Sequence, residues 1–237
     1  MPSTHLHHSH AHHEEHFAGS DLLSDIIIGM SDGLTVPFAL AAGLSGAVSD
    51  PHIILTAGMA EIIAGSIAMG LGGYLSGRTE IDHYKAELGR EYEETELYPE
   101  VEKQEVRDVF KEYGLSTASQ NLIIDELSKN RDKWVEFMMR FELGLEKPDE
   151  KRATRAAFNI GASYIVGGII PLMPYIFSKN VHEGFYLSVV ITLIALTVFG
   201  YFKSKVIGQS PWKGALQTAA IGAAAAATAY AVAKLFN

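Results

Sequence analysis

The chain contains no cysteine, which excludes disulfides and thiolate metal ligands. Any metal ion must therefore be held by oxygen, nitrogen or thioether ligands, and a structural zinc site is not expected. The chain also lacks a basic face, because its formal net charge is -9 and its largest charged block is acidic. That block has the sign of the phosphate backbone, so no nucleic-acid partner is expected.

The net negative charge is confined to one segment of a chain that is 48% hydrophobic. Residues 80–150 contain 20 acidic and 10 basic residues, whereas the rest of the chain contains 8 acidic and 9 basic ones. The apolar and acidic characters therefore belong to different segments. The predicted organisation is a tail, two spans, an acidic helical metal-binding domain and three further spans, at residues 1–20, 21–78, 79–150 and 151–237.

Five long apolar stretches dominate the sequence. Each is close to the ~20 residues needed to cross a ~30 Å hydrocarbon core. The alternative is a large soluble bundle, but its helices would keep a polar face, and the third and fourth stretches have no charged residue. The sequence thus predicts an all-α polytopic membrane protein. The five predicted transmembrane helices cover residues 26–48, 53–75, 156–177, 185–202 and 215–236.

Lysine and arginine next to the predicted spans indicate their orientation. The linker at 49–52 has neither residue, and the linker at 178–184 has only Lys179, whereas the second and fourth linkers carry several. Positive linkers stay on the cytosolic side, which predicts a cytosolic N-terminus and a C-terminus on the far side. Five spans cannot form two matched halves, so a homodimer is expected to complete the pathway.

The acidic segment is predicted to be helical. Residues 79–97 continue the second span without a breaker, and Pro99 suits the first turn of a helix that ends before Gly114. Ser116 and Asn130 can each cap a further helix, ending near residues 129 and 144. This predicts a cytosolic unit of three or four helices inserted between the second and third spans.

Carboxylates of this segment are spaced so that they share helix faces. Glu91 and Glu94 are three residues apart, as are Glu102 and Glu105, and the turn at Pro99 can bring the two pairs together. Met138 and Glu142 are four residues apart, so a regular helix would direct both towards the same space. Oxygen ligands suit ferrous iron and manganese, and thioethers disfavour calcium and magnesium. Such spacing is also common on solvated helices, so it does not decide between a metal site and a charged surface. The candidate ligands are Glu91, Glu94, Glu102, Glu105, Met138, Met139 and Glu142.

Two carboxylates lie within the apolar stretches. Asp32 is in the first and Glu61 in the second, where a charged side chain costs ~2.5 kcal/mol or more and therefore indicates function. Asp32 and Met69 each lie six residues from the predicted cytosolic end of their span, which pairs an oxygen and a sulfur ligand at one depth. A lone methionine in a span more often serves packing. Glu61 lies two turns from Met69 and is a candidate to pass on the ion or accept a proton.

The N-terminal tail is polar and lacks the features of a signal peptide. Its imidazoles are able to bind metal weakly, but a solvated, disordered cytosolic tail is the preferred interpretation. The tail histidines are His5, His7, His8, His10, His12, His13 and His16.

Residues 31–40 (SDGLTVPFAL), residues 61–70 (EIIAGSIAMG) and the acidic insert, in this order, closely resemble plant vacuolar iron transporters. The resemblance covers nearly the whole chain after residue 20. It implies homodimers of five-span subunits that exchange ferrous iron for protons from the acidic vacuole. It also implies that Asp32 and Met69 line the pathway with help from Glu61, and that the candidate ligands of the insert form a cytosolic metal site.

The expected function is therefore proton-coupled transport of ferrous iron from the cytosol across the vacuole membrane, with a lumenal C-terminus. The chain is not expected to be an enzyme or to hold a permanent cofactor. Its partners would be lipid, a second copy and divalent ions, with Mn2+, Co2+ and Zn2+ as further cargoes and H+ as counter-ion. A membrane-anchored iron buffer or sensor is the main alternative. A di-iron oxidase is a weaker one, because the insert lacks a Glu-x-x-His pattern.

Overall fold

A computed structural model describes residues 18–236 of the chain. All regular elements in this described part are helical, which confirms the all-α prediction. Within residues 18–236, five helices are long and apolar enough to cross a membrane, matching the five predicted spans. The histidine-rich tail, up to His16, lies outside the described residues.

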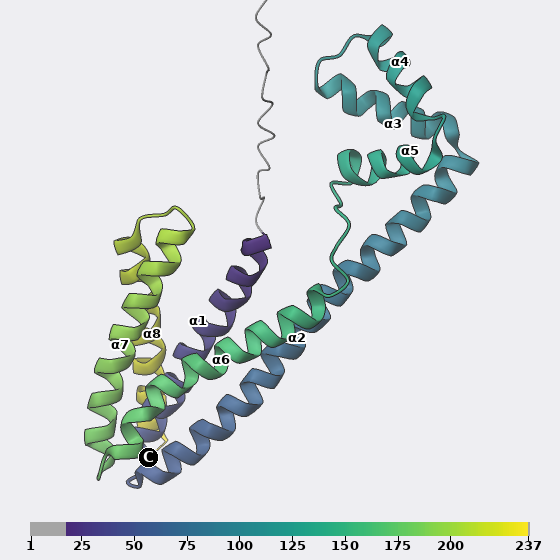
Figure 1. Cartoon of the computed structure of the whole chain (residues 1–237). Helices are drawn as coiled ribbons and strands as arrows, with labels where there is room; N and C mark the ends of the chain where they lie inside the picture. The colour runs from purple at the N-terminus through teal and green to yellow at the C-terminus, as the bar shows by residue number, and fades with distance from the viewer. Residues whose placement is uncertain (1–17, 237) are drawn as a thin grey trace, which may run out of the picture. The chain divides into compact units, whose positions relative to one another are not determined.

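The helices form two compact units, one containing the described residues up to Met69 and those from Asn159 onward, the other spanning Gly70–Phe158. The five long helices, labelled in Figure 1, are α1 (Ala18–Ser45), α2 (Pro51–Leu97), α6 (Arg152–Phe177), α7 (Val181–Val206) and α8 (Pro211–Leu235). The short ones are α3 (Pro99–Glu112), α4 (Thr117–Leu127), α5 (Arg131–Phe137) and the π-helix η1 (Met138–Glu142).

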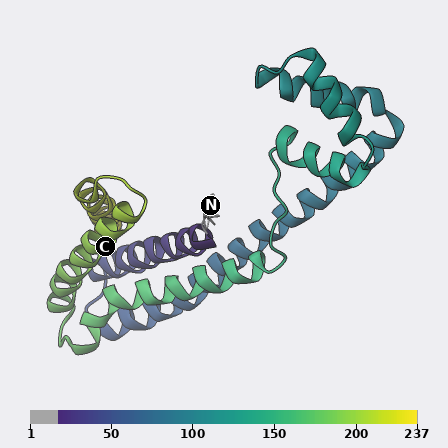
Figure 2. The ribbon, with the colours of Figure 1, turned by 45° about the horizontal axis from the view of Figure 1, so that its top comes forward.

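In the first unit, α7 and α8 pack against each other and both contact α1. Figures 1 and 2 show these helices in two views. Small side chains make this approach possible. A Cβ at Gly200 of α7 would lie 2.6 Å from the carbonyl oxygen of Gly214 on α8. Close backbone approach supplies van der Waals packing where lipid removes the hydrophobic driving force.

Helix α6 packs against α1 and α2 at glycines. A Cβ at Gly58 would lie 2.6 Å from Leu172, and one at Gly65 would lie 2.5 Å from the Tyr164 hydroxyl. On α1, a Cβ at Gly33 would clash with the Tyr164 carbonyl oxygen. These glycines therefore set how closely α6 lies to the two helices that carry Asp32 and Glu61.

In the second unit, the predicted starts of the short helices at Pro99, Ser116 and Asn130 are confirmed. The Ser116 side chain accepts a hydrogen bond from the Ser119 N–H, and Asn130 accepts one from Lys133. Gly114 follows α3 with φ +76°, a left-handed conformation that favours glycine. Helices α3, α4 and α5 then enclose a small core of Val106, Ile124, Trp134 and Met138.

The last helix of this unit differs from the prediction. Its final turn is a π-helix, in which the Leu143 N–H donates to the Met138 carbonyl five residues earlier. The wider turn removes the four-residue alignment that the sequence analysis assumed for Met138 and Glu142. Met138 is instead fully buried in the apolar core, while Glu142 is exposed at the surface of the unit. Single-turn π-helices occur frequently at functional sites.

Candidate functional site

Three sequence-predicted pathway residues lie in the first unit. Asp32 on α1 and Glu61 and Met69 on α2 are all partly buried. The Asp32 carboxylate makes no hydrogen bond or ion pair with any residue that the structure describes. Its charge lies within electrostatic range of the Tyr164 hydroxyl, which places Asp32 and Glu61 near a common neighbour. No coordination contact between Asp32 and Met69 is present, so their pairing stays a prediction.

Glu61 has a partner that the sequence analysis missed. The Tyr164 hydroxyl donates a hydrogen bond to Glu61 Oε1, joining α6 to α2. Glu61 Oε2 is buried and has no hydrogen-bond partner within residues 18–236. A buried polar atom without a partner costs free energy, so a bound cation would stabilise this oxygen.

A second buried carboxylate on α1 was also missed. Asp25 is 1% exposed, and its Oδ2 accepts a hydrogen bond of 3.2 Å from Asn159 Nδ2 on α6. Asp25 precedes Asp32 by seven residues, which places both on one helix face. The seven-residue spacing from Asp32 could have identified Asp25. It was overlooked because Asp25 lies just before the first predicted span, which begins at residue 26.

In the second unit, acidic side chains are buried where the sequence analysis placed the metal site. Glu91 of α2 is 2% exposed and Glu102 of α3 is 3% exposed. The Oε2 atoms of both have no hydrogen-bond partner in the described part of the chain. Two orphaned carboxylate oxygens in one small unit are costly unless a cation or protons compensate them.

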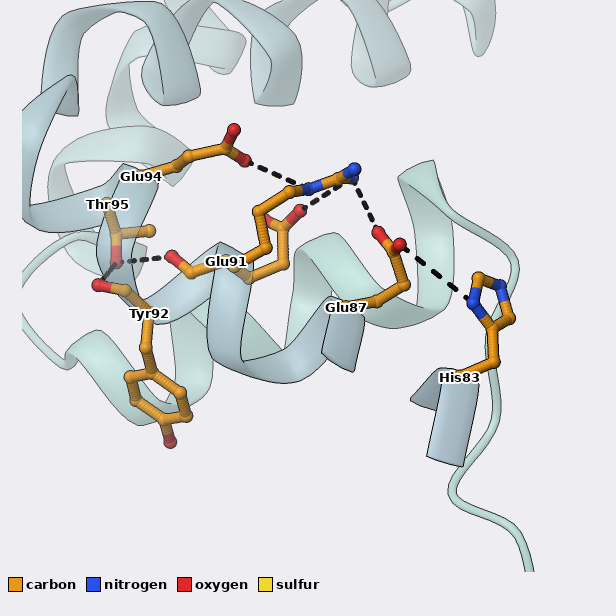
Figure 3. Close-up of polar contacts among 7 residues, drawn as sticks. His83, Glu87, Glu91, Tyr92, Glu94 and Thr95 are labelled. Atoms are coloured by element: carbon orange, nitrogen blue, oxygen red, sulfur yellow. Dashed lines mark hydrogen bonds and ion pairs between the residues drawn. The ribbon is translucent and has the colours of Figure 1, made fainter. Parts of the chain in front are cut away.

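Arg90 supplies part of the positive charge that these carboxylates need. Its guanidinium lies 2.7 Å from Glu87, 3.4 Å from Glu94 and 3.8 Å from Glu91. Figure 3 shows these carboxylates on successive turns of α2, with His83 beyond Glu87. Arg90 is thus a partly exposed counter-ion beside the predicted ligands, and the sequence analysis did not single it out.

Mutual repulsion changes the protonation of the cluster. Burial, followed by the charges of Glu105 and Glu91, raises the pKa of Glu102 to about 7. Partial burial and then the charges of Glu105 and Glu91 raise the pKa of Glu142 to about 7, although its side chain reaches the surface. The pKa of Glu105 is also raised, mainly by burial and by Glu94. The five predicted carboxylates therefore form one electrostatic cluster.

The carboxylates of the cluster lie beside a surface groove and do not surround a closed site. Glu105 and Glu142 line a groove of about 260 Å³ between α3 and the π-helix. Within residues 18–236, no three histidine or carboxylate side chains lie close enough to form a ready-made metal site. Met139 lines a different cavity, beside Tyr84. The structure thus gathers the predicted carboxylates, while both thioethers are buried away from the groove.

The raised pKa values predict how the stability of this unit depends on pH. The folded state binds protons at Glu102 and Glu142 more tightly than the unfolded state does, so ionisation favours unfolding. Without metal, stability should fall as the pH rises from about 5 through about 7, and it should level off near about pH 8. Added Mn2+ should stabilise the unit more at pH 8 than at pH 6, because it binds ionised carboxylates.

Tryptophan fluorescence can measure this effect in the full-length protein in detergent. Trp134 lies in the core of the second unit, and a Trp212→Phe background removes the only other tryptophan. Glu102→Gln should weaken the pH dependence. Glu136→Gln is the control, because Lys133 lowers the pKa of the exposed Glu136. Equal stabilisation by Mn2+ at pH 6 and pH 8 would contradict the assignment of these carboxylates as metal ligands.

A profile of the VIT family matches residues 23–234. The chain belongs to this family. The VIT-family chain is 50% identical to "Vacuolar iron transporter 1" of Oryza sativa subsp. japonica over 228 residues, covering 96% of this chain and 90% of the relative. It is 51% identical to the protein of the same name from Arabidopsis thaliana over 224 residues, covering 94% and 90%.

A more distant relative is "Protein CCC1" of Saccharomyces cerevisiae, 37% identical over 224 residues. That match covers 91% of the VIT-family chain and 69% of the yeast protein. The matches extend across the apolar helices and the acidic insert alike. The resemblance to plant vacuolar iron transporters is therefore confirmed as family membership.

Proposed function

We propose that this chain carries ferrous iron from the cytosol into the vacuole in exchange for protons, as a homodimer in the vacuole membrane. The observation that carries the proposal is the placement of Asp32 and Glu61 on two apolar helices, where Glu61 keeps a buried oxygen without a partner. Carboxylates in hydrocarbon are costly and mark ion or proton pathways. The names of the relatives support iron as cargo and the vacuole as destination.

The acidic unit serves as the cytosolic collector in this proposal. Its carboxylates raise the local concentration of divalent cations, and ionised oxygens with nearby thioethers favour transition metals over calcium. Mn2+, Co2+ and Zn2+ suit the same ligands. The carboxylates are Glu91, Glu94, Glu102, Glu105 and Glu142, and Met138 and Met139 would contribute thioethers only after leaving their buried positions.

Protons complete the cycle at the membrane carboxylates. An ion bound by Asp32 and Met69 leaves when a proton from the acidic side neutralises Asp32 or Glu61, because a neutral carboxyl holds a cation poorly. Linkers rich in lysine and arginine support a cytosolic N-terminus and a lumenal C-terminus.

Iron flux into sealed vesicles tests the proposal. Purified full-length protein is reconstituted into liposomes that contain an iron-quenched fluorophore, and ferrous iron is added outside with ascorbate. Quenching should be faster than in protein-free liposomes and should saturate with iron concentration. Iron binding in detergent without any change inside the vesicles would overturn transport and favour a membrane-anchored buffer.

A further inference from the structure

Tyr164 is a buried hydroxyl group whose hydrogen-bond partner is a carboxylate. The side chain is 2% exposed on the apolar helix α6, and its hydroxyl donates to Glu61 Oε1 on α2. A buried tyrosine hydroxyl needs a partner, and a neutral oxygen would satisfy it. Tyr175, on the same helix, uses such a neutral partner, the Ser45 hydroxyl at 2.8 Å.

The backbones of two helices leave room for the Tyr164 ring and hydroxyl. Gly65 follows Glu61 by one helical turn, and a Cβ there would lie 2.5 Å from the Tyr164 hydroxyl oxygen. Gly33, directly after Asp32, lies against the Tyr164 backbone. Both glycines therefore sit beside a pathway carboxylate and against the same tyrosine, which fixes α6 next to Asp32 and Glu61.

The hydrogen bond makes the two oxygens of Glu61 unequal. Oε1 is occupied by Tyr164, whereas Oε2 is buried without a partner among the described residues. A carboxylate held in this way binds a divalent ion through one oxygen rather than two. One-oxygen binding is weaker, and the ion leaves faster.

We propose that Tyr164 is a positioning residue of the transport step, which holds Glu61 so that a passing divalent cation meets only Oε2. This inference rests on the proposed transport function. Tyr164 touches Glu61 and acts through it. The hydroxyl thereby prevents Glu61 from trapping the ion with both oxygens, and a site on a transport pathway must release its cargo as well as bind it.

Kinetics of Tyr164→Phe in the liposome assay test the proposal. The maximal rate should fall about tenfold and the apparent KM should fall with it, because the ion binds more tightly and leaves more slowly. Tyr175→Phe is the matched control, since it also removes a buried hydroxyl from α6 and should keep wild-type kinetics. A merely structural loss would lower the rate without lowering KM and would affect both variants.

A second pair of variants tests the same hydrogen bond without changing the Tyr164 side chain. Gly65→Ala pushes the hydroxyl away from Glu61 and should reproduce the Tyr164→Phe kinetics. Gly72→Ala, one heptad further on α2, adds a methyl where no atom lies within 4 Å and should change nothing. Tyr164→Phe should also have no further effect in a Glu61→Gln background.

The outcomes of these experiments distinguish the role of Tyr164 from the proposed transport function. Wild-type kinetics in Tyr164→Phe, or an undiminished effect of Tyr164→Phe in the Glu61→Gln background, would overturn the role of Tyr164 and leave transport intact. Wild-type liposomes that take up no iron would overturn the transport function, and the role of Tyr164 with it.

Discussion

Asp32→Asn should reduce iron uptake on the order of 100-fold, equivalent to about 2.8 kcal/mol. The amide keeps the shape of the side chain but carries no charge and cannot exchange a proton. Asp32 has no ion pair in the described part of the chain, so its charge is not needed to balance a structural cation. Folding should therefore survive, and the loss should appear in the maximal rate of liposome uptake.

Asp50→Asn is the matched control for this variant. Asp50 is an exposed acid between α1 and α2, and its side chain accepts a hydrogen bond from the His52 N–H, which asparagine can also accept. Uptake by Asp50→Asn should equal that of wild type. Iron binding by the acidic unit should remain in both variants, because neither changes its carboxylates. Full transport by Asp32→Asn would remove Asp32 from the pathway.

The paired substitution Glu102→Gln with Glu142→Gln should weaken metal binding by the acidic unit about 100-fold, or about 2.8 kcal/mol. These two carboxylates have the most strongly raised pKa values of the cluster, so they contribute most to its demand for a cation. Transport should slow about tenfold at low iron concentrations, and its maximal rate should persist, because the unit collects the ion without forming the membrane pathway.

The control for this pair changes net charge equally at sites outside the cluster. Glu100 and Glu136 are exposed and form ion pairs with Lys103 and Lys133. Glu100→Gln with Glu136→Gln should therefore leave metal binding and uptake near wild type, as expected for surface ion pairs. Equal losses in both double variants would show that bulk charge, rather than a defined cluster, attracts the metal. Isothermal titration with Mn2+ measures the binding.

Local sequence signals were sufficient for the helical framework. Length and apolar composition predict the five long helices, because the cost of exposed backbone in lipid permits little else. Pro99, Gly114, Ser116 and Asn130 predict the short helices, since each acts through a neighbouring backbone group. Such interactions are encoded within a few residues and do not depend on distant parts of the chain.

Contacts between distant segments could not be predicted in this way. The hydrogen bond from Tyr164 to Glu61 joins residues 103 positions apart, and Asn159 meets Asp25 across a longer separation. The π-turn at Met138 also depends on context, because the apolar core of the second unit takes that side chain. Spacing grouped carboxylates that influence one another's pKa in the structure, but it assumed regular α-helical turns for the thioethers.

The most direct test of the account measures iron and protons together in the same liposomes. With an acidic interior, ferrous iron added outside should enter while the internal pH rises, and an ionophore that collapses the pH gradient should slow iron entry. Asp32→Asn should abolish both signals. Iron entry that leaves the internal pH unchanged and is insensitive to the gradient would contradict proton-coupled transport through the membrane carboxylates.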